Sequence, residues 1–269
     1  MQYDPIKRTL GKVFNQTPAL RKLFYRLLDC LLLRAWHVKK ELRELSFGEK
    51  STILDAGSGF GQYTYRMSRM FPRSEILAVD VKEEQIEDCN RFFDKIKLSD
   101  RVKFEVADLT KLVRGDQFNL ILSIDVMEHI EEDVLVFKNF YQSLKEGGVL
   151  LISTPSDQGG SDTHDHEEGA HGFIDEHVRD GYNIEEIEEK LKSAGFSVVE
   201  TRYSYGSPGK ISWRLSMKYP IQLLGVSRLF FILIPFYYLI VFPFAAMLNY
   251  FDVKGIHKTG TGLIVKAYK

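Results

Sequence analysis

Between Ser51 and Ser153 the chain alternates short β-forming runs with helical stretches, and this alternation constrains the fold more than any other feature. Alternation of this kind predicts parallel strands joined by right-handed crossovers, with helices on both faces of the sheet. Helical stretches such as Glu83–Lys97 and Glu131–Leu144 separate the strands. The seven runs that we expect to form one α/β sheet are Thr52–Leu54, Glu75–Val79, Val102–Val106, Phe118–Ser123, Val149–Ser153, Phe196–Tyr205 and Gly262–Tyr268.

The first predicted strand runs directly into a glycine-rich turn. Glycines at this place permit a tight turn and let a ligand approach backbone N–H groups at the N-terminus of the next helix, expected from about Gln62. The spacing is G-x-G-x-G, with Gln62 where the dinucleotide-binding fingerprint has its third glycine, which argues against a nicotinamide cofactor. The turn reads Leu54-Asp55-Ala56-Gly57-Ser58-Gly59-Phe60-Gly61.

Acidic residues also follow the second and third predicted strands. Asp80 ends the second strand, about 25 residues after Asp55, where a carboxylate can accept both hydroxyls of a ribose. Asp108 follows the third strand, at the height where an adenine would lie. The ends of three successive strands therefore carry signals for one nucleotide-like ligand.

With these three signals in order, the chain resembles the class I S-adenosylmethionine-dependent methyltransferases, from about Lys50 to Tyr205 and over the final strand. The resemblance implies a Rossmann-like seven-stranded methyltransferase sheet, S-adenosylmethionine as cofactor and methyl transfer as activity. In the family, the first acid and the glycines hold the methionine end, the second acid holds the ribose, and an Asp-Leu pair flanks the adenine. The cofactor-binding residues that this implies are Asp55, Ala56, Gly57, Ser58, Gly59, Gly61, Asp80, Val81, Ala107, Asp108, Leu109 and Ser123.

The segment after the fourth strand resembles a motif of methyltransferases that modify quinone precursors. Some of those enzymes bring an acid, a Glu and a His to a divalent metal, and Asp125, Glu128 and His129 stand at the matching positions. We favour the interpretation that Glu128 and His129 cap and orient the next helix, so a metal is an alternative that the sequence does not favour.

A long polar loop follows Pro155 and carries four of the seven histidines. An imidazole there can take a proton from a substrate hydroxyl near neutral pH, or the loop can bind a transition metal or act as a solvated lid. Its end, from His177 to Tyr182, resembles the lid that closes over cofactor and substrate in many relatives. The candidate catalytic residues are therefore Asp125, His129, His166, His171, His177, Arg179 and Tyr182.

An uncharged apolar run, Leu229–Leu248, lies between the last two predicted strands and has about the length that spans a bilayer. A single crossing would place Gly262–Tyr268 on the far side of the membrane, and Pro235 and Pro243 interrupt a straight helix, so we expect a bent or re-entrant element. The alternatives are an internal helical lid and a dimer interface. Between Arg202 and Phe251 there is no Asp or Glu, whereas five cations favour anionic lipid headgroups: Arg202, Lys210, Arg214, Lys218 and Arg228.

The sequence therefore predicts three parts. Residues 1–48 form an N-terminal amphipathic segment, in which Thr17-Pro18 begins a helix of roughly 25 residues that ends near Leu45. Residues 49–206 with 259–269 form the S-adenosylmethionine-binding methyltransferase domain. Residues 207–258 form an apolar insertion that associates with a membrane or acts as a lid.

The net charge of −1 provides no overall field that would attract nucleic acid, so we expect no nucleic-acid partner. Cys30 and Cys89 show no metal-binding spacing and fit a reducing cytoplasm, and residues 1–16 lack the apolar stretch of a signal peptide. We expect a cytoplasmic protein that is peripheral or monotopic on the inner face of the membrane.

The function that the sequence favours is O- or C-methylation of a lipophilic small molecule, such as a lipid, quinone-like, aryl or polyene acceptor, at the membrane surface. Two alternatives are an NAD-dependent oxidoreductase and a non-catalytic cofactor-binding membrane scaffold. The sequence does not predict an oligomeric state.

Overall fold

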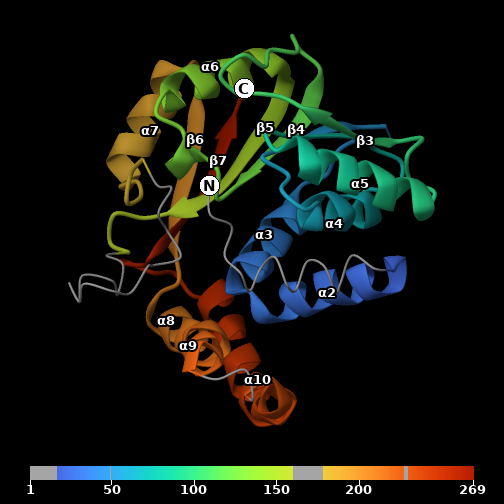
Figure 1. Cartoon of the computed structure of the whole chain (residues 1–269). Coiled ribbons are helices and arrows are strands. Elements are labelled where there is room, and N and C mark those ends of the chain that lie inside the picture. The colour runs from blue at the N-terminus through green and yellow to red at the C-terminus, as the bar shows by residue number, and fades with distance from the viewer. Residues whose placement is uncertain (1–16, 49, 160–177, 227–229) are drawn as a thin grey trace. The chain divides into compact units, whose positions relative to one another are not determined.

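The computed structural model describes residues 17–48, 50–159, 178–226 and 230–269, and it divides the chain into two compact units (Figure 1). The first, which we call the sheet unit, comprises Ser46–Thr201 and Leu263–Lys269. The second, which we call the helical unit, comprises Tyr3–Leu45 and Arg202–Gly262. The helices described within residues 17–45 and those of the insertion thus fall in one unit.

The sheet has seven strands in the order β3-β2-β1-β4-β5-β7-β6. The first five strands pair in parallel, and β1 lies between β2 and β4. The predicted α/β sheet is confirmed. The strands are β1 (Thr52–Ala56), β2 (Glu75–Asp80), β3 (Val102–Val106), β4 (Phe118–Ile124), β5 (Leu144–Pro155), β6 (Val198–Ser204) and β7 (Gly262–Tyr268).

Helices cover both faces of this sheet, with α4 and α5 on one face and α6 and α7 on the other (Figure 1). The central strands consist mainly of apolar side chains that are buried, as expected for a parallel sheet covered on both sides. Asn183 caps α7 by accepting a 2.7 Å hydrogen bond from the Glu186 N–H. The helices are α4 (Gln62–Met70), α5 (Glu83–Lys95), the 3₁₀ turn η1 (Met127–His129), α6 (Asp133–Ser143) and α7 (Ile184–Ser193).

One strand is longer than its sequence predicted. β5 begins at Leu144 rather than at Val149, because pairing with β4 resumes beyond a register shift. Phe118 pairs with Leu144, whereas Leu120 pairs with Val149, so the intervening Lys-Glu-Gly-Gly residues bulge out of the ladder.

The prediction of one continuous N-terminal helix is wrong. The chain forms α2 (Pro18–Leu31) and α3 (Leu33–Glu44), separated at Leu32, whose backbone is extended with φ −82° and ψ 113°. The predicted start is correct, since the Thr17 hydroxyl accepts a hydrogen bond from the Leu20 N–H.

No Gly or Pro marks this break in the sequence. Its physical reason is tertiary packing. α3 buries Ala35, Val38 and Leu42, whereas α2 leaves Leu23 and Leu27 exposed on its apolar stripe. The two helices therefore present different faces to the interior, which one straight helix does not allow.

The insertion between β6 and β7 forms two helical arms. The first arm consists of α8 (Ser207–Trp213), the π-helical η2 (Arg214–Lys218) and α9 (Tyr219–Val226), and the second is α10 (Phe230–Lys254). Figure 1 shows these helices side by side. We call the two arms together the apolar hairpin.

Polar contacts join the two arms of the apolar hairpin, which run antiparallel to each other. Near its base, the Ser212 hydroxyl lies 2.6 Å from the side-chain oxygen of Asn249. Farther along, the Tyr237 and Tyr238 hydroxyls donate to backbone carbonyls of the π-helical segment, at 2.7 Å to Leu215 and 2.6 Å to Ser216. A π-helix often marks a functional or irregular site, and here two hydroxyls from the other arm satisfy its carbonyls.

The two prolines of the apolar run lie inside one helix, because α10 continues through Pro235 and Pro243. Each proline removes one N–H donor from the helix ladder and leaves the rest of the 25-residue helix bonded. Residues 227–229, between the two arms in the sequence, lie outside the described residues.

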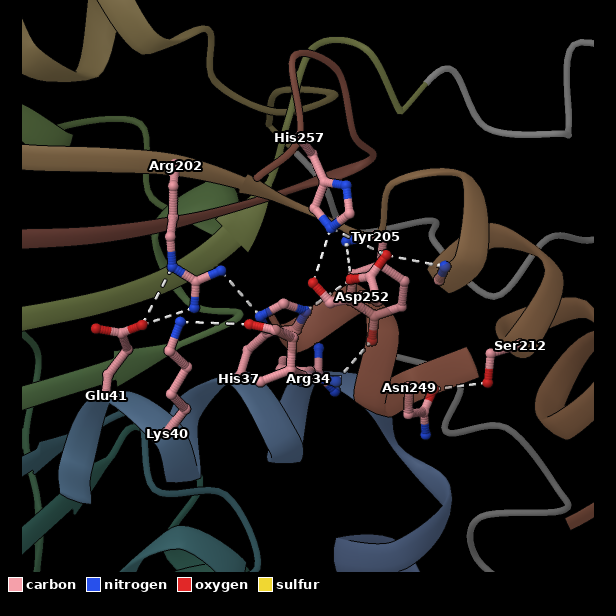
Figure 2. A network of polar contacts seen from close by, with 12 residues as sticks. Arg34, His37, Lys40, Glu41, Arg202, Tyr205, Ser212, Asn249, Asp252 and His257 are labelled. Carbon is pink, nitrogen blue, oxygen red and sulfur yellow. Dashed lines mark hydrogen bonds and ion pairs between the residues drawn. The ribbon is translucent and has the colours of Figure 1, made fainter. Parts of the chain in front are cut away.

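The base of the apolar hairpin is held by the buried carboxylate of Asp252 (Figure 2). This carboxylate accepts hydrogen bonds from the Tyr205 N–H at 3.1 Å and the Gly209 N–H at 2.9 Å, and His37 Nε2 lies 2.8 Å away. Although burial raises the pKa of Asp252, the hydrogen bond from His37 and nearby charges hold that pKa below its usual value. One side chain thus joins α3, the end of β6, α8 and α10.

The hydrogen bonds around His37 determine its tautomer. Arg202 Nη1 lies 3.0 Å from His37 Nδ1, and a guanidinium only donates, so Nδ1 is an acceptor and Nε2 carries the proton. Burial lowers the pKa of His37, which agrees with a neutral ring between Arg202 and Asp252. The charge of Arg202 is balanced by Glu41, whose Oε1 accepts from its Nη2 at 2.6 Å.

We predict that Asp252→Ala destabilises the protein by about 3 to 5 kcal/mol, because it leaves two backbone N–H groups and the His37 ring without their acceptor in a buried site. Urea unfolding followed by circular dichroism measures the change, with the exposed Asp100→Ala as control. Asp252→Asn, which keeps one acceptor oxygen, should fall between the two, and a loss equal to that of the control would contradict the role of Asp252.

Candidate active site

The glycine turn after β1 is tied to the end of β2 by backbone hydrogen bonds. The N–H groups of Gly57 and Ser58 both donate to the Val79 carbonyl at 2.9 Å. Gly57 has φ +83°, in the region that favours glycine. Because β1 and β2 are parallel neighbours, the turn lies at the carboxyl edge of the sheet, where open α/β sheets bind their ligands.

The three glycines of the turn have different surroundings. A Cβ at position 57 would lie 2.2 Å from a methyl carbon of Val126, and one at position 61 would lie 3.2 Å from the Cys89 sulfur. A Cβ at Gly59 would meet only the Gln85 side chain, at 3.9 Å. Packing therefore requires Gly57 and Gly61, whereas the backbone of Gly59 faces open space and is the one that a ligand can approach.

Asp55 lies at the end of β1 and is buried, with its Oδ2 accepting a 2.5 Å hydrogen bond from the Thr64 hydroxyl of α4. Burial and, to a smaller extent, the charge of Asp80 raise the pKa of Asp55 to about 7, although the hydrogen bond from Thr64 lowers it. The side chain thus links the first strand to its helix and holds a proton near neutral pH.

Asp80 connects the glycine turn with the third strand. Its Oδ2 accepts from the Gly59 N–H at 2.9 Å and its Oδ1 accepts from the Lys82 N–H at 3.0 Å, while its backbone carbonyl accepts from Ala107 at 3.1 Å. The structure therefore brings the ends of β1, β2 and β3 together around one half-buried carboxylate, as the sequence predicted.

The residues predicted to flank an adenine lie just beyond this carboxylate. Asp108 accepts hydrogen bonds from the hydroxyl and the N–H of Thr110, at 2.7 Å and 2.9 Å, and these bonds lower the pKa of Asp108. Leu109 is buried, whereas Val81 is exposed. The segments after β2 and β3 thus supply one fixed acid, Asp108, with the exposed Val81 and the buried Leu109.

After β4 the backbone is strained at Asp125, which has φ +50° and donates its N–H to the Ser153 carbonyl at 2.8 Å. Glu128 is buried, and its side chain accepts a 3.1 Å hydrogen bond from Thr154. His129 is exposed. Of Asp125, Glu128 and His129, only the His129 side chain is exposed to solvent.

Arg179 and Tyr182 engage the start of α6 rather than the glycine turn. The Tyr182 hydroxyl donates to Asp133 Oδ2 at 2.8 Å, Lys190 Nζ lies 2.8 Å from the same oxygen, and Arg179 pairs with it as well. Although burial raises the pKa of Asp133, the bonds from Lys190 and Tyr182 and the charge of Arg179 hold that pKa below its usual value. In the described structure both residues position the segment after β5.

The remaining candidate bases, His166, His171 and His177, lie outside the described residues. Within the part of the chain that the structure describes, no three His, Cys, Asp or Glu side chains are grouped to hold a metal ion.

The model of the family described as "Methyltransferase domain" matches residues 48–201. The chain belongs to the S-adenosylmethionine-dependent methyltransferase family. The family and its cofactor, S-adenosylmethionine, are therefore as predicted, and the alternative of an NAD-dependent oxidoreductase is excluded.

Characterised relatives of this methyltransferase differ in their acceptors. Phosphoethanolamine N-methyltransferase 1 of Zea mays is 30% identical over 162 residues, which are 60% of this chain and 31% of that enzyme. Sterol 24-C-methyltransferase of Debaryomyces hansenii is 26% identical over 159 residues, 58% of this chain and 42% of that enzyme. The matched region thus spans less than half the length of either relative.

A solved structure of phosphoethanolamine N-methyltransferase 2 from Haemonchus contortus, in complex with phosphomonomethylethanolamine and S-adenosylhomocysteine, has the same fold. It is 18% identical, with a TM-score of 0.63 over 100% of this chain and 61% of that chain. The identity is too low to carry more than the fold.

The described residues fit the cofactor of the methyltransferase family. The hydroxyls of Ser58 and Ser123 are buried at the ends of β1 and β4, and neither has a hydrogen-bond partner among the described residues. A buried polar group without a partner is uncommon unless a ligand or water supplies one. With the open face of Gly59 and the carboxylate of Asp80, these hydroxyls form a set of polar groups at one sheet edge.

Sequence reasoning named Arg179 and Tyr182 but missed Asp133 and Lys190, with which they form a cluster. Asp133 and Lys190 are 57 residues apart, and no motif joins them. It also missed Asp252, although one signal was present: from Thr201 to Lys269 this is the only Asp or Glu of the sequence.

We predict that Asp80→Ala weakens the binding of S-adenosylmethionine by about 1 to 3 kcal/mol, as expected for the loss of charge-assisted hydrogen bonds. Titration calorimetry measures the affinity, and the exposed carboxylate variant Glu84→Ala is the control. Asp80→Asn tests whether the bond to Gly59 alone suffices. An unchanged affinity in Asp80→Ala would show that the ribose is held elsewhere.

A second prediction concerns pH. The folded protein keeps a proton on Asp55 up to its pKa of about 7, whereas the unfolded chain loses it near pH 4. Stability contributed by the protonated carboxyl is therefore full below pH 4 and lost as pH rises toward 7. The free energy of unfolding of the cofactor-free wild type should fall by about 2 to 4 kcal/mol relative to Asp55→Asn between pH 4.5 and 8. A constant difference would contradict the raised pKa.

Proposed function

We propose that the protein transfers the methyl group of S-adenosylmethionine to an oxygen or carbon atom of a lipophilic small molecule at a membrane surface. The observation that carries the lipophilic and membrane part is the polarity of the apolar hairpin, which buries Ser212, Ser216 and Asn249 between its arms and exposes large apolar side chains along α10.

The cofactor half of the proposal rests on the carboxyl edge of the sheet. Gly59 and Ser58 are suited to the methionine end, Asp80 to the ribose, and Asp108 with Leu109 to the adenine. When bound, S-adenosylmethionine supplies a methyl group that its sulfonium charge already activates. The protein then has to align the acceptor and exclude water, which requires few reactive side chains.

A base is needed mainly when the acceptor is a hydroxyl. Among the described residues we favour His129, because its ring is exposed beyond β4 next to the strained Asp125. Arg179 and Tyr182 fit positioning roles, since Asp133 engages both. His166, His171 and His177 stay candidates on the evidence of the sequence alone.

The apolar hairpin supports the proposal that the protein acts at a membrane surface. Ser212, Ser216 and Asn249 are buried between its arms, whereas Leu239 is 77% exposed and Ile240 is 68% exposed. A core helix of a soluble protein has the opposite arrangement. Isolated exposed leucines are common, but here a row of large apolar side chains runs along one helix. The exposed members are Ile232, Leu233, Phe236, Leu239, Ile240, Phe244, Met247, Tyr250 and Phe251.

The helix from Ile232 to Lys254 is also long and apolar enough to cross a membrane, and only 11% of its most apolar window is buried. This low burial argues against an internal lid. We favour a peripheral or monotopic position on the inner face, because the two arms leave and return to neighbouring strands, β6 and β7. One of the relatives is a sterol methyltransferase by name, which supports a lipid as acceptor.

The test is a methyl-transfer assay with S-adenosylmethionine carrying a labelled methyl group and total membrane lipids from bacteria and yeast as acceptors. We predict that label enters the organic phase with wild-type protein and that Asp80→Ala reduces the rate by about 5-fold or more at sub-saturating cofactor. Glu84→Ala is the matched control.

Mass spectrometry of the product distinguishes O-, C- and N-methylation. Label confined to water-soluble acceptors would contradict the lipophilic substrate. Cofactor binding without label in any fraction would favour the non-catalytic scaffold.

A further inference from the structure

The two units carry opposite net charges, although the whole chain is close to neutral. Residues 1–45 and 202–262, which contain the helical unit, hold 17 Lys and Arg against 5 Asp and Glu, a net charge of +12. The rest of the chain holds 19 against 32, a net charge of −13. The net charge of −1 therefore hides a strongly basic unit that also exposes the apolar hairpin.

Within the apolar hairpin the cations are concentrated on the first arm, and the charges of α10 lie only at its end, at Asp252 and Lys254. Lys210, Arg214 and Lys218 are spaced by four residues on the α8–η2 arm and thus share a side of that helix. α10 has no charged residue between Phe230 and Phe251. One arm is therefore basic and the other apolar, which is the pattern of elements that lie in a membrane interface.

Exposed aromatic side chains accompany these cations. Trp213 and Tyr219 are exposed on the basic arm, and Tyr250 is exposed on α10 next to Asn249, which pairs with Ser212. Trp and Tyr prefer the level of lipid headgroups, where an apolar ring can carry a polar group into water. Cations and aromatic rings thus coincide near the base of the apolar hairpin.

We infer that the helical unit docks on anionic bilayers, with the exposed face of α10 at the acyl boundary of one leaflet and Lys210, Arg214 and Lys218 on the headgroups. This inference rests on the proposed function only in assuming that the apolar hairpin meets lipid. The charge of the helical unit argues against the helical unit of a second copy as occupant, because two such units would repel each other. The acidic sheet unit is in turn repelled by an anionic surface.

The test is flotation of the full-length protein with vesicles of phosphatidylcholine alone and of phosphatidylcholine with phosphatidylglycerol, at low and high salt. The triple variant Lys210→Gln, Arg214→Gln and Lys218→Gln should lose about 10-fold or more in affinity for the anionic vesicles, and so should wild type in high salt. The matched control, Lys95→Gln, Lys103→Gln and Lys138→Gln in the sheet unit, should change affinity by less than about 2-fold.

A second measurement reports the position of the apolar hairpin. The sequence has two tryptophans, so Trp36→Phe leaves Trp213 as the single reporter. Its emission should shift to the blue with anionic vesicles and not with neutral ones. Equal affinity for both vesicle types, or an unchanged triple variant, would overturn the inference while leaving the membrane part of the proposed function intact.

Assays in detergent micelles separate this inference from the methyl-transfer activity. The triple variant should bind S-adenosylmethionine and methylate dispersed acceptor as wild type does. A wild-type protein that floats with neither vesicle but sediments as a dimer would overturn the inference in favour of a second copy.

Discussion

The candidate cofactor site depends on the pairing of β1 with β2 on one side and with β4 on the other. This central position brings the ends of three strands to one edge and places Asp55, the glycine turn and Ser123 there together. Backbone hydrogen bonds then extend the arrangement to Asp80 and Ala107. Because these links are backbone groups of a buried parallel sheet, the polar groups suited to the cofactor are held before it binds.

The helical unit reverses the usual placement of polar and apolar side chains in a soluble domain. Its polar groups meet in the interior, at Asp252 and between the arms of the apolar hairpin, and its large apolar side chains face outward. Such an arrangement is stable only if every interior polar group finds a partner. Asp252, His37, Arg202 and Glu41 supply these partners to one another.

How far the sequence predicts this structure depends on whether the determining interactions are local. The strands of the sheet and the Thr17 cap were predictable, because hydrophobic periodicity and capping act within a few residues. The break at Leu32 was not, since it comes from packing that no local signal announces. Proline preferences alone do not predict that one helix continues through Pro235 and Pro243, because they describe an isolated helix, whereas neighbouring groups can satisfy freed carbonyls. In the candidate site, the motif residues of β1, β2 and β3 meet at one sheet edge, whereas the partners of Asp133 come from distant segments.

Because β6 and β7 are neighbours in the sheet, the apolar hairpin also bears on how the chain folds. Pairing these strands directly would close a loop of 57 residues, from Tyr205 to Thr261. Forming the apolar hairpin first brings the Tyr205 N–H to Asp252, which leaves only the segment from Val253 to Thr261 to be closed. Since the entropy of loop closure grows with the logarithm of length, this order of events lowers the barrier to completing the sheet by about 1 to 2 kcal/mol. The last strand of the sheet is thus expected to join late, after the helices that precede it in the chain.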